Sequence, residues 1–137
     1  MRERFPSYDA SLSGNWARVL IAEDDGVIRR LLEVNFSLEG YDVAFAERGE
    51  DAIRQAQVGG FDLILLDVMM PGMDGWAVAE RLKEDERTSG IPIIFLSARS
   101  QEQDRERGLR LGVAAYVTKP FDPDELLGLA AELIRGR

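Results

Sequence analysis

Short apolar runs alternate along the chain with stretches in which apolar residues recur at helical spacing. Runs of four to six residues rich in Val, Ile, Leu and Phe are typical of strands that are buried on both faces. We expect five strands of this kind, at Val19–Ala22, Tyr41–Ala46, Phe61–Leu66, Ile91–Leu96 and Val113–Thr118.

Each apolar run is followed by a segment with the period of a helix. We expect helices at Val27–Leu38, Glu50–Val58, Trp76–Leu82, Glu102–Leu111 and Pro123–Ile134, the fourth of them polar and charged. Five βα units with buried strands predict a doubly wound α/β fold with a parallel sheet and helices on both faces. Residues 1–16 precede this pattern, and we expect a flexible lead-in there, anchored by Trp16, before a single domain at 17–137.

Composition narrows the functions that such a fold can carry. The net charge of −8 argues against direct binding to nucleic acid or to an anionic membrane. The chain has neither Cys nor His, which excludes disulfides, thiolate or imidazole metal sites and Ser–His catalysis. No apolar run is long enough to cross a bilayer, so we expect a soluble cytoplasmic protein.

Polar side chains follow four of the five apolar runs. They are Glu23, Asp24 and Asp25 after the first run, Asp67 after the third, Ser97 after the fourth and Lys119 after the fifth. The carboxyl ends of parallel strands form the ligand-binding edge of such sheets, so these side chains should converge. Asp25 is expected to cap the following helix. Asp67 lies among apolar residues, where an unpartnered carboxylate is costly to bury.

Grouped carboxylates repel one another unless a cation lies among them, and their oxygen atoms suit Mg2+. A lysine opposite them would pair with an anion bound to that cation, so the set suits a phosphoryl group with Asp67 as the nucleophile. Dinucleotide and flavin sites need a glycine-rich or small polar loop after the first strand, where this chain has three acids. The P-loop pattern is absent from the sequence.

Four segments together resemble the receiver domain of two-component response regulators, the family that includes the chemotaxis regulators. The segments are Val19–Asp25, Asp62–Gly75, Phe95–Ala98 and Tyr116–Phe121, and the resemblance extends from Arg18 to about Arg135. It implies the flavodoxin-like strand order 2-1-3-4-5. It also implies a signalling phospho-acceptor, not an enzyme, that takes its phosphoryl group from a sensor histidine kinase or a histidine phosphotransfer protein and then controls a downstream protein or output domain.

The resemblance assigns the phosphoryl and metal positions residue by residue. Asp67 matches the phospho-accepting aspartate of the family. Asp24 would bind Mg2+ directly, which Mn2+ could replace, and Glu23 would act through water. Met69 would offer its backbone carbonyl to the metal.

The resemblance also assigns the residues that respond to phosphorylation. Ser97 matches the switch hydroxyl, and Lys119 matches the lysine that contacts the phosphoryl group. The Lys119–Pro120 peptide bond is expected to be cis. Tyr116 matches an aromatic switch position that changes between exposed and inward rotamers, although a half-buried strand aromatic would give the same pattern.

Several positions depart from the commonest family pattern. Ala114, Ala115 and Leu129 stand where many transcription regulators carry the charges of a salt-bridged dimer, whereas Arg105 remains. Met69 and Arg99 flank the path of the attacking water, and neither orients water as an amide or acid would, so a long-lived phosphoryl group is expected.

Two other functional classes remain open at this point. A binding module with constitutive output would not need phosphorylation of Asp67. A phosphatase that used Asp67 as its nucleophile would need an acid for the leaving group, and the sequence offers no evident candidate.

Overall fold

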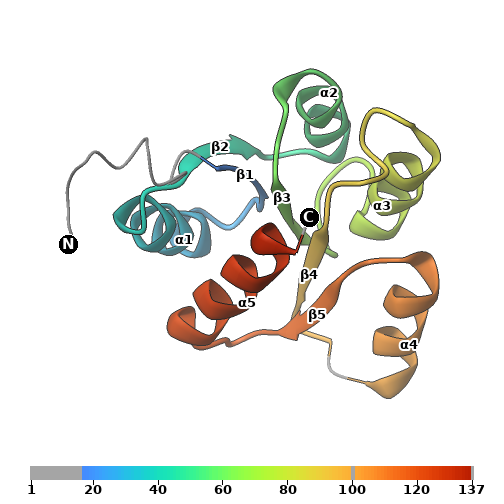
Figure 1. Cartoon of the computed structure of the whole chain (residues 1–137). Helices are drawn as coiled ribbons and strands as arrows, with labels where there is room; N and C mark the ends of the chain where they lie inside the picture. Colours follow the sequence, from blue (N-terminus) through green and yellow to red (C-terminus); the bar gives the residue numbers. More distant parts are fainter. Residues whose placement is uncertain (1–16, 100, 137) are drawn as a thin grey trace.

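A computed structural model describes residues 17–99 and 101–136. The elements alternate strictly from β1 to α5 (Figure 1): β1 (Arg18–Ala22), α1 (Gly26–Leu38), β2 (Asp42–Ala46), α2 (Gly49–Gly59), β3 (Leu63–Asp67), α3 (Gly75–Glu84), β4 (Ile93–Ser97), α4 (Glu102–Leu111), β5 (Ala115–Thr118) and α5 (Pro123–Arg135). All strand pairs are parallel in the order β2-β1-β3-β4-β5, which confirms the predicted fold. The expected lead-in at 1–16 and its anchor Trp16 lie outside the described residues.

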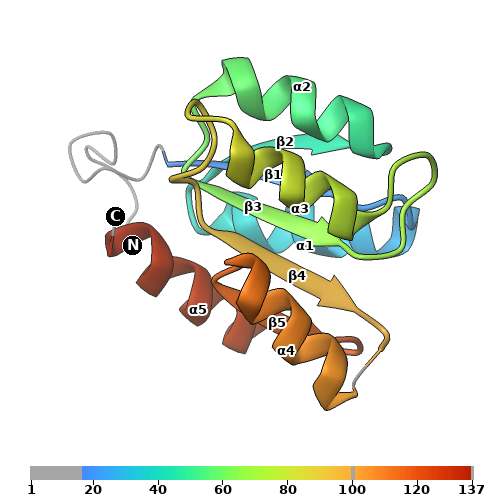
Figure 2. The same ribbon diagram turned by 90° about the vertical axis from the view of Figure 1, so that its right-hand side faces the viewer.

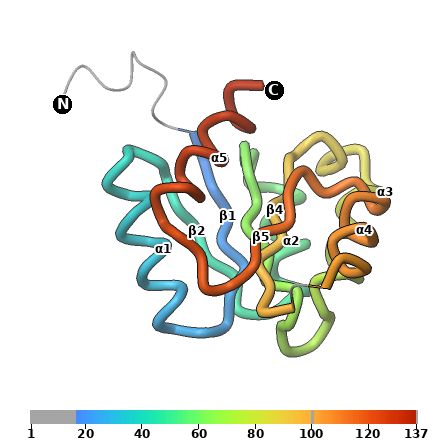
Figure 3. Tube along the Cα trace, turned by 90° about the horizontal axis from the view of Figure 1, so that it is seen from below, coloured from blue at the N-terminus to red at the C-terminus, as the bar shows by residue number. Residues whose placement is uncertain are grey.

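The sheet is covered by helices on both faces, as Figures 2 and 3 show. Alternate residues of one strand enter two separate cores, because side chains of a strand alternate between its faces. In β1, Val19 and Ile21 pack in the core that includes residues of α1 and α5. Leu20 and Ala22 pack in the core that includes residues of α2 and α3. All four are fully buried, so the continuous apolar run is explained by two covered faces.

Four expected strands begin later than their apolar runs, at Asp42, Leu63, Ile93 and Ala115. Tyr41, Ile91 and Val113 direct their N–H groups to the preceding helix or turn, at Phe36 O, Thr88 O and Gly108 O. Each therefore belongs to the closing turn, not to the ladder of the sheet. Ile91 and Val113 are 4% exposed, so their apolar character reflects core packing and not strand pairing.

The helices differ in how they begin and in what they bury. Asp25 caps α1, as predicted, because its Oδ1 accepts hydrogen bonds from Val27 N at 2.9 Å and Ile28 N at 3.2 Å. By contrast, α4 starts without a side-chain cap, and its only buried residue is Gly108. Among the residues that the structure describes, no helix combines the length and the apolar character needed to cross a membrane.

Candidate functional site

The polar residues that end β3 and β4 or follow β1 and β5 meet at the carboxyl edge of the sheet. In the strand register, Asp67 lies opposite Leu96 and Ser97 lies opposite Thr118, so both strands end at the same level. Lys119 reaches across this edge: its Nζ donates to Glu23 Oε1 at 2.9 Å and lies 3.4 Å from Asp67 Oδ2. The structure thus brings together groups that are 96 residues apart along the chain.

Glu23, Asp24 and Asp67 form a cluster of carboxylates in which one oxygen from each lies within 4.8 Å of the others. Glu23 is fully buried, Asp67 is 4% exposed, and Asp24 is exposed. A donor set of hard oxygens beside solvent fits Mg2+, which keeps several waters when it is bound. Both oxygens of Glu23 are already engaged, since Oε2 accepts from Asp25 N at 3.1 Å. Asp24, the exposed member of the cluster, is therefore better placed for direct ligation than Glu23.

Burial and neighbouring charges shift the pKa values of Glu23 and Lys119. Burial raises the pKa of Glu23 to about 7, the Lys119 hydrogen bond opposes this shift, and the neighbouring Asp67 adds to it. Burial alone would lower the pKa of Lys119, but its contacts with Glu23 and Asp67 raise it. Lys119 therefore stays an ammonium ion at neutral pH. Of the two causes that raise the pKa of Glu23, burial is larger than the neighbouring Asp67 carboxylate.

The backbone around Asp67 holds its carboxylate in place. Met69 N donates to Asp67 Oδ1 at 3.0 Å, while the Met69 side chain is 61% exposed. Gly75 packs against the same turn: a Cβ there would lie 2.6 Å from the carbonyl oxygen of Asp67. Sequence reasoning missed Gly75, and the available signal was a glycine at the first position of a helix, where alanine has the better helix propensity.

Ser97 and Tyr116 are joined through the backbone of Arg99. Ser97 is fully buried, and its Oγ accepts a hydrogen bond from Arg99 N at 3.0 Å. Tyr116 is 8% exposed and points inward, with its hydroxyl donating to the Arg99 carbonyl at 3.1 Å. A single residue therefore connects the two side chains. The Lys119–Pro120 bond beside them is cis.

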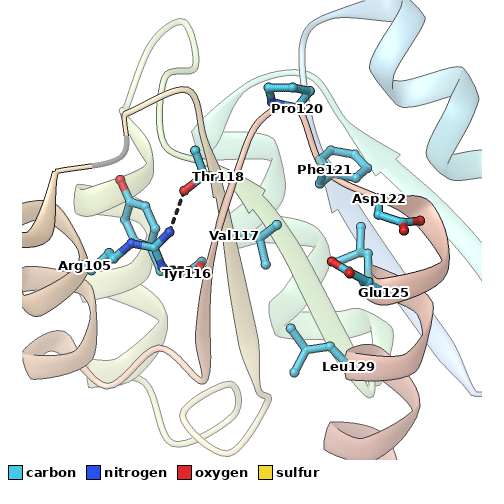
Figure 4. A pocket seen from close by; sticks show the side chains of 10 residues that line it. Arg105, Tyr116, Val117, Thr118, Pro120, Phe121, Asp122, Glu125 and Leu129 are labelled. Atoms are coloured by element: carbon cyan, nitrogen blue, oxygen red, sulfur yellow. Dashed lines mark hydrogen bonds between the residues drawn. The ribbon is translucent and has the colours of Figure 1, made fainter.

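A hollow of about 360 Å³ lies beside β5, between α4 and α5 (Figure 4). Arg105 borders one side of it, where its guanidinium donates to Tyr116 O at 3.3 Å and to Thr118 Oγ1 at 2.8 Å. Leu129 lies on the side of α5, beside the acidic Glu125. Arg105 thus serves contacts within the chain.

A second hollow, of about 300 Å³, lies beside the site and is lined by Ile28, Leu31, Lys119, Pro120 and Phe121. It continues into an exposed apolar stripe on α1. The stripe consists of Val27 at 82%, Leu31 at 41%, Val34 at 41% and Leu38 at 79% exposure. Residues at these intervals lie along one side of a helix, so the stripe runs lengthwise along α1.

Comparison with known proteins agrees with this geometry. The family model of the response regulator receiver domain matches residues 19–131. The chain is 42% identical over 118 residues to the DNA-binding dual master transcriptional regulator RpaA of Synechocystis sp., covering 86% of this chain and 49% of that protein. It spans about half the length of the curated relatives that it matches.

Solved structures show the same likeness. The receiver domain of the Francisella response regulator 1452 has a TM-score of 0.83 and 32% identity, covering 88% of this chain and 98% of that one. The receiver domain of the sensor histidine kinase PA1611 from Pseudomonas aeruginosa, with a magnesium ion coordinated in its active site cleft, has a TM-score of 0.81 and 31% identity with the same coverage. The chain belongs to the response regulator receiver domain family, whose members are phospho-accepting signalling domains of two-component systems.

Proposed function

We propose that this chain accepts a phosphoryl group on Asp67 and signals through the conformation of its α4–β5 region. The observation that carries the proposal is the setting of Asp67, a nearly buried carboxylate at the polar carboxyl edge of the sheet. It is 4% exposed, with Oδ1 held by Met69 N and Oδ2 facing the Lys119 ammonium at 3.4 Å. One oxygen is thereby fixed and the other is oriented beside a cation, which suits a nucleophile.

The transfer follows from this arrangement. Asp67 Oδ2 attacks the phosphorus of a phosphohistidine, the P–O bond forms, and the P–N bond breaks with its electron pair returning to the imidazole, which takes up a proton from water. Lys119 pairs with the negative charge that accumulates on the phosphoryl oxygens. The chain supplies the acceptor and its surroundings, so it acts as a phospho-acceptor and not as a turnover enzyme.

Asp24, Asp67 and the Met69 carbonyl would hold Mg2+, with Glu23 acting through water. Bound there, the cation would neutralise charge on the phosphoryl oxygens, and Mn2+ accepts the same oxygen donors. Glu23 has a second task that needs no metal: its Oε1 holds the Lys119 Nζ at 2.9 Å, so the ammonium stays over the site before any phosphoryl group arrives.

The switch uses Ser97 and Tyr116. When the Ser97 hydroxyl turns to a phosphoryl oxygen on Asp67, it no longer accepts the hydrogen bond from Arg99 N. The same residue accepts the Tyr116 hydroxyl through its carbonyl, so the loop and the tyrosine change together. The outcome is a population shift in the α4–β5 region that a partner or output domain reads.

The partner that delivers the phosphoryl group docks beside the site. The α1 stripe of Val27, Leu31, Val34 and Leu38 and the hollow next to Lys119 suit an apolar helix face that presents a phosphohistidine. We assign this role to a sensor histidine kinase or a phosphotransfer protein. We further propose that residues 17–137 form the receiver unit, that it acts in the cytoplasm, and that neither nucleic acid nor membrane binds to it directly.

The decisive experiment is incubation with acetyl phosphate and Mg2+ followed by intact mass and peptide mapping. The parent should gain one phosphoryl group on Asp67, Asp67→Asn should gain none, and Glu80→Gln, which changes an exposed acid on α3, should behave as the parent. Phosphorylation that persists in Asp67→Asn overturns the assignment. If Asp67→Asn keeps full partner binding and output, a constitutive binding module replaces this proposal.

A further inference from the structure

Helix α4 is attached to the rest of the domain by two cations on aromatic rings and by a single partly buried apolar side chain, Leu111. Its only buried residue is Gly108. Two arginines of the helix lie over rings of neighbouring elements. The Arg107 Cζ lies 4.1 Å from the centroid of the Trp76 ring on α3, and the Arg105 Cζ lies 5.6 Å from the centroid of the Tyr116 ring on β5.

The two rings belong to one aromatic cluster. Phe95 lies edge-on to both, with its centroid 4.9 Å from that of Trp76 and 6.1 Å from that of Tyr116. Trp76 and Tyr116 are themselves 6.4 Å apart. Both are largely buried, at 6% and 8% exposure, so a displacement of one ring requires the others to repack.

The close packing of α4 depends on Gly108. A Cβ at this position would lie 3.3 Å from the Tyr116 ring and 3.3 Å from Val113. The helix backbone therefore rests against the tyrosine ring itself. An outward or sliding movement of α4 must separate Arg107 from Trp76, because the two lie on different helices, whereas Arg105 can follow β5 through its bonds to Tyr116 O and Thr118 Oγ1.

We propose that Arg107 is a positioning residue: its contact with Trp76 holds α4 in the resting arrangement and thereby sets the ease with which Asp67 is phosphorylated. The inference rests on the proposed function, since it concerns the equilibrium between the resting and phosphorylated states. The path runs from Ser97 through the Arg99 backbone to Tyr116, and from there across the aromatic cluster to Arg107. Because the contact belongs to the resting state, its removal favours the phosphorylated arrangement.

Arg110 provides a matched control on the same helix. It is an exposed arginine that makes no ring contact or ion pair with the residues that the structure describes. Arg107→Gln and Arg110→Gln change the net charge equally, so a difference between them isolates the contact with Trp76. Arg107→Lys retains a cation for the ring and serves as the conservative rescue.

The test is a titration of the metal-loaded protein with beryllium fluoride, a phosphoryl mimic, followed by the amide NMR signals of residues 66–69. Arg107→Gln should reach half-saturation at about a two- to fivefold lower concentration than the parent, as expected for loss of one cation–π contact. Arg107→Lys should stay near the parent, and Arg110→Gln should equal it. The Trp76 indole signal should shift on saturation in the parent.

The outcomes separate this inference from the function on which it rests. Equal half-saturation in Arg107→Gln and Arg110→Gln overturns the role of Arg107, even if Arg107→Gln melts at a lower temperature. A parent that binds no beryllium fluoride and gains no phosphoryl group overturns the proposed function and the role of Arg107 with it. A fall in the half-saturating beryllium fluoride concentration that is as large in Arg107→Lys as in Arg107→Gln also contradicts the role, because the cation is then irrelevant.

Discussion

Helices α5 and α4 lie on either side of β5, yet they are attached to the sheet by different forces. In α5, Leu126 and Ala130 are buried, and Leu127, Leu129, Leu133 and Ile134 pack against the same core. In α4, the only buried residue is Gly108, Leu111 alone packs a partly buried apolar side chain against the core, and two arginines contact aromatic rings. Burying a leucine contributes about 1.5–3 kcal/mol, whereas an exposed cation–π contact contributes about 0.5–1 kcal/mol. Displacing α4 from the sheet therefore costs less free energy than displacing α5.

The comparison predicts that truncating a buried side chain in the layer formed by α1 and α5 causes the largest loss of stability. Phe36→Ala should lower the free energy of unfolding by about 3–5 kcal/mol, because Phe36 is fully buried beside Leu32. Leu38→Ala removes a side chain that is 79% exposed, so its effect should stay within about 0.5 kcal/mol. Urea unfolding measures both. A similar loss for the two variants would contradict the core assignment.

The contribution of the site to the free energy of unfolding, unlike that of the two helix layers, should depend on pH. The pKa of Glu23 rises from 4.5 to about 7 on folding, so the folded state binds the proton more tightly. Its contribution to stability is complete below pH 4.5 and is lost as the pH rises through 7, on the order of 2–3 kcal/mol. Glu23→Gln should flatten the unfolding free energy across this interval in metal-free buffer. An unchanged pH profile in Glu23→Gln would refute the shift.

Magnesium should stabilise the site by linkage. At ten times its dissociation constant, the ion adds about 1.4 kcal/mol to the free energy of unfolding, so the melting temperature should rise at millimolar concentrations. Asp24→Asn should lose most of this rise, since Asp24 is the exposed member of the carboxylate cluster. Calorimetry with and without Mg2+ measures the rise in melting temperature. A parent melting temperature that does not change on addition of Mg2+ would count against the metal site.

The phosphoryl group on Asp67 should be long-lived. The exposed Met69 side chain orients no water, and the Arg99 guanidinium is drawn towards α4, where its Nε lies 3.6 Å from Asp104 Oδ2. The double variant Met69→Asn with Arg99→Glu should dephosphorylate severalfold faster in matched Mg2+, as followed by loss of phosphoryl mass. No acceleration in the double variant would refute this account of lifetime.

Much of the fold could be predicted because the strands are buried on both faces. Continuous apolar runs such as Leu63–Leu66 that alternate with helical segments favour a covered parallel sheet, and the strand-end rule then locates the polar residues. The boundaries at Tyr41, Ile91 and Val113 were missed because hydrophobicity reports burial and not hydrogen-bond direction.

Contacts between distant elements could not be predicted in the same way. The strand-end rule predicts that Lys119 and Glu23 lie at one edge but not that they pair directly, because β5 and β1 are separated in the sheet by β3 and β4. The Arg107–Trp76 contact joins two helices whose relative position no periodicity encodes. Gly75 matters through its distance from the Asp67 carbonyl, which only the folded loop reveals.

The contrast between α4 and α5 is tested most directly by hydrogen exchange on the Mg2+-loaded protein, with and without acetyl phosphate. The account predicts that phosphorylation of Asp67 alters exchange in α4 and β5, at residues 102–118, while the buried turns of α1 and α5 around Phe36 and Leu126 stay unchanged. In Asp67→Asn, acetyl phosphate should alter neither region. Exchange that changes equally in α4 and α5, or only in α5, would contradict the claim that α4 is the loosely held, responsive side of the domain.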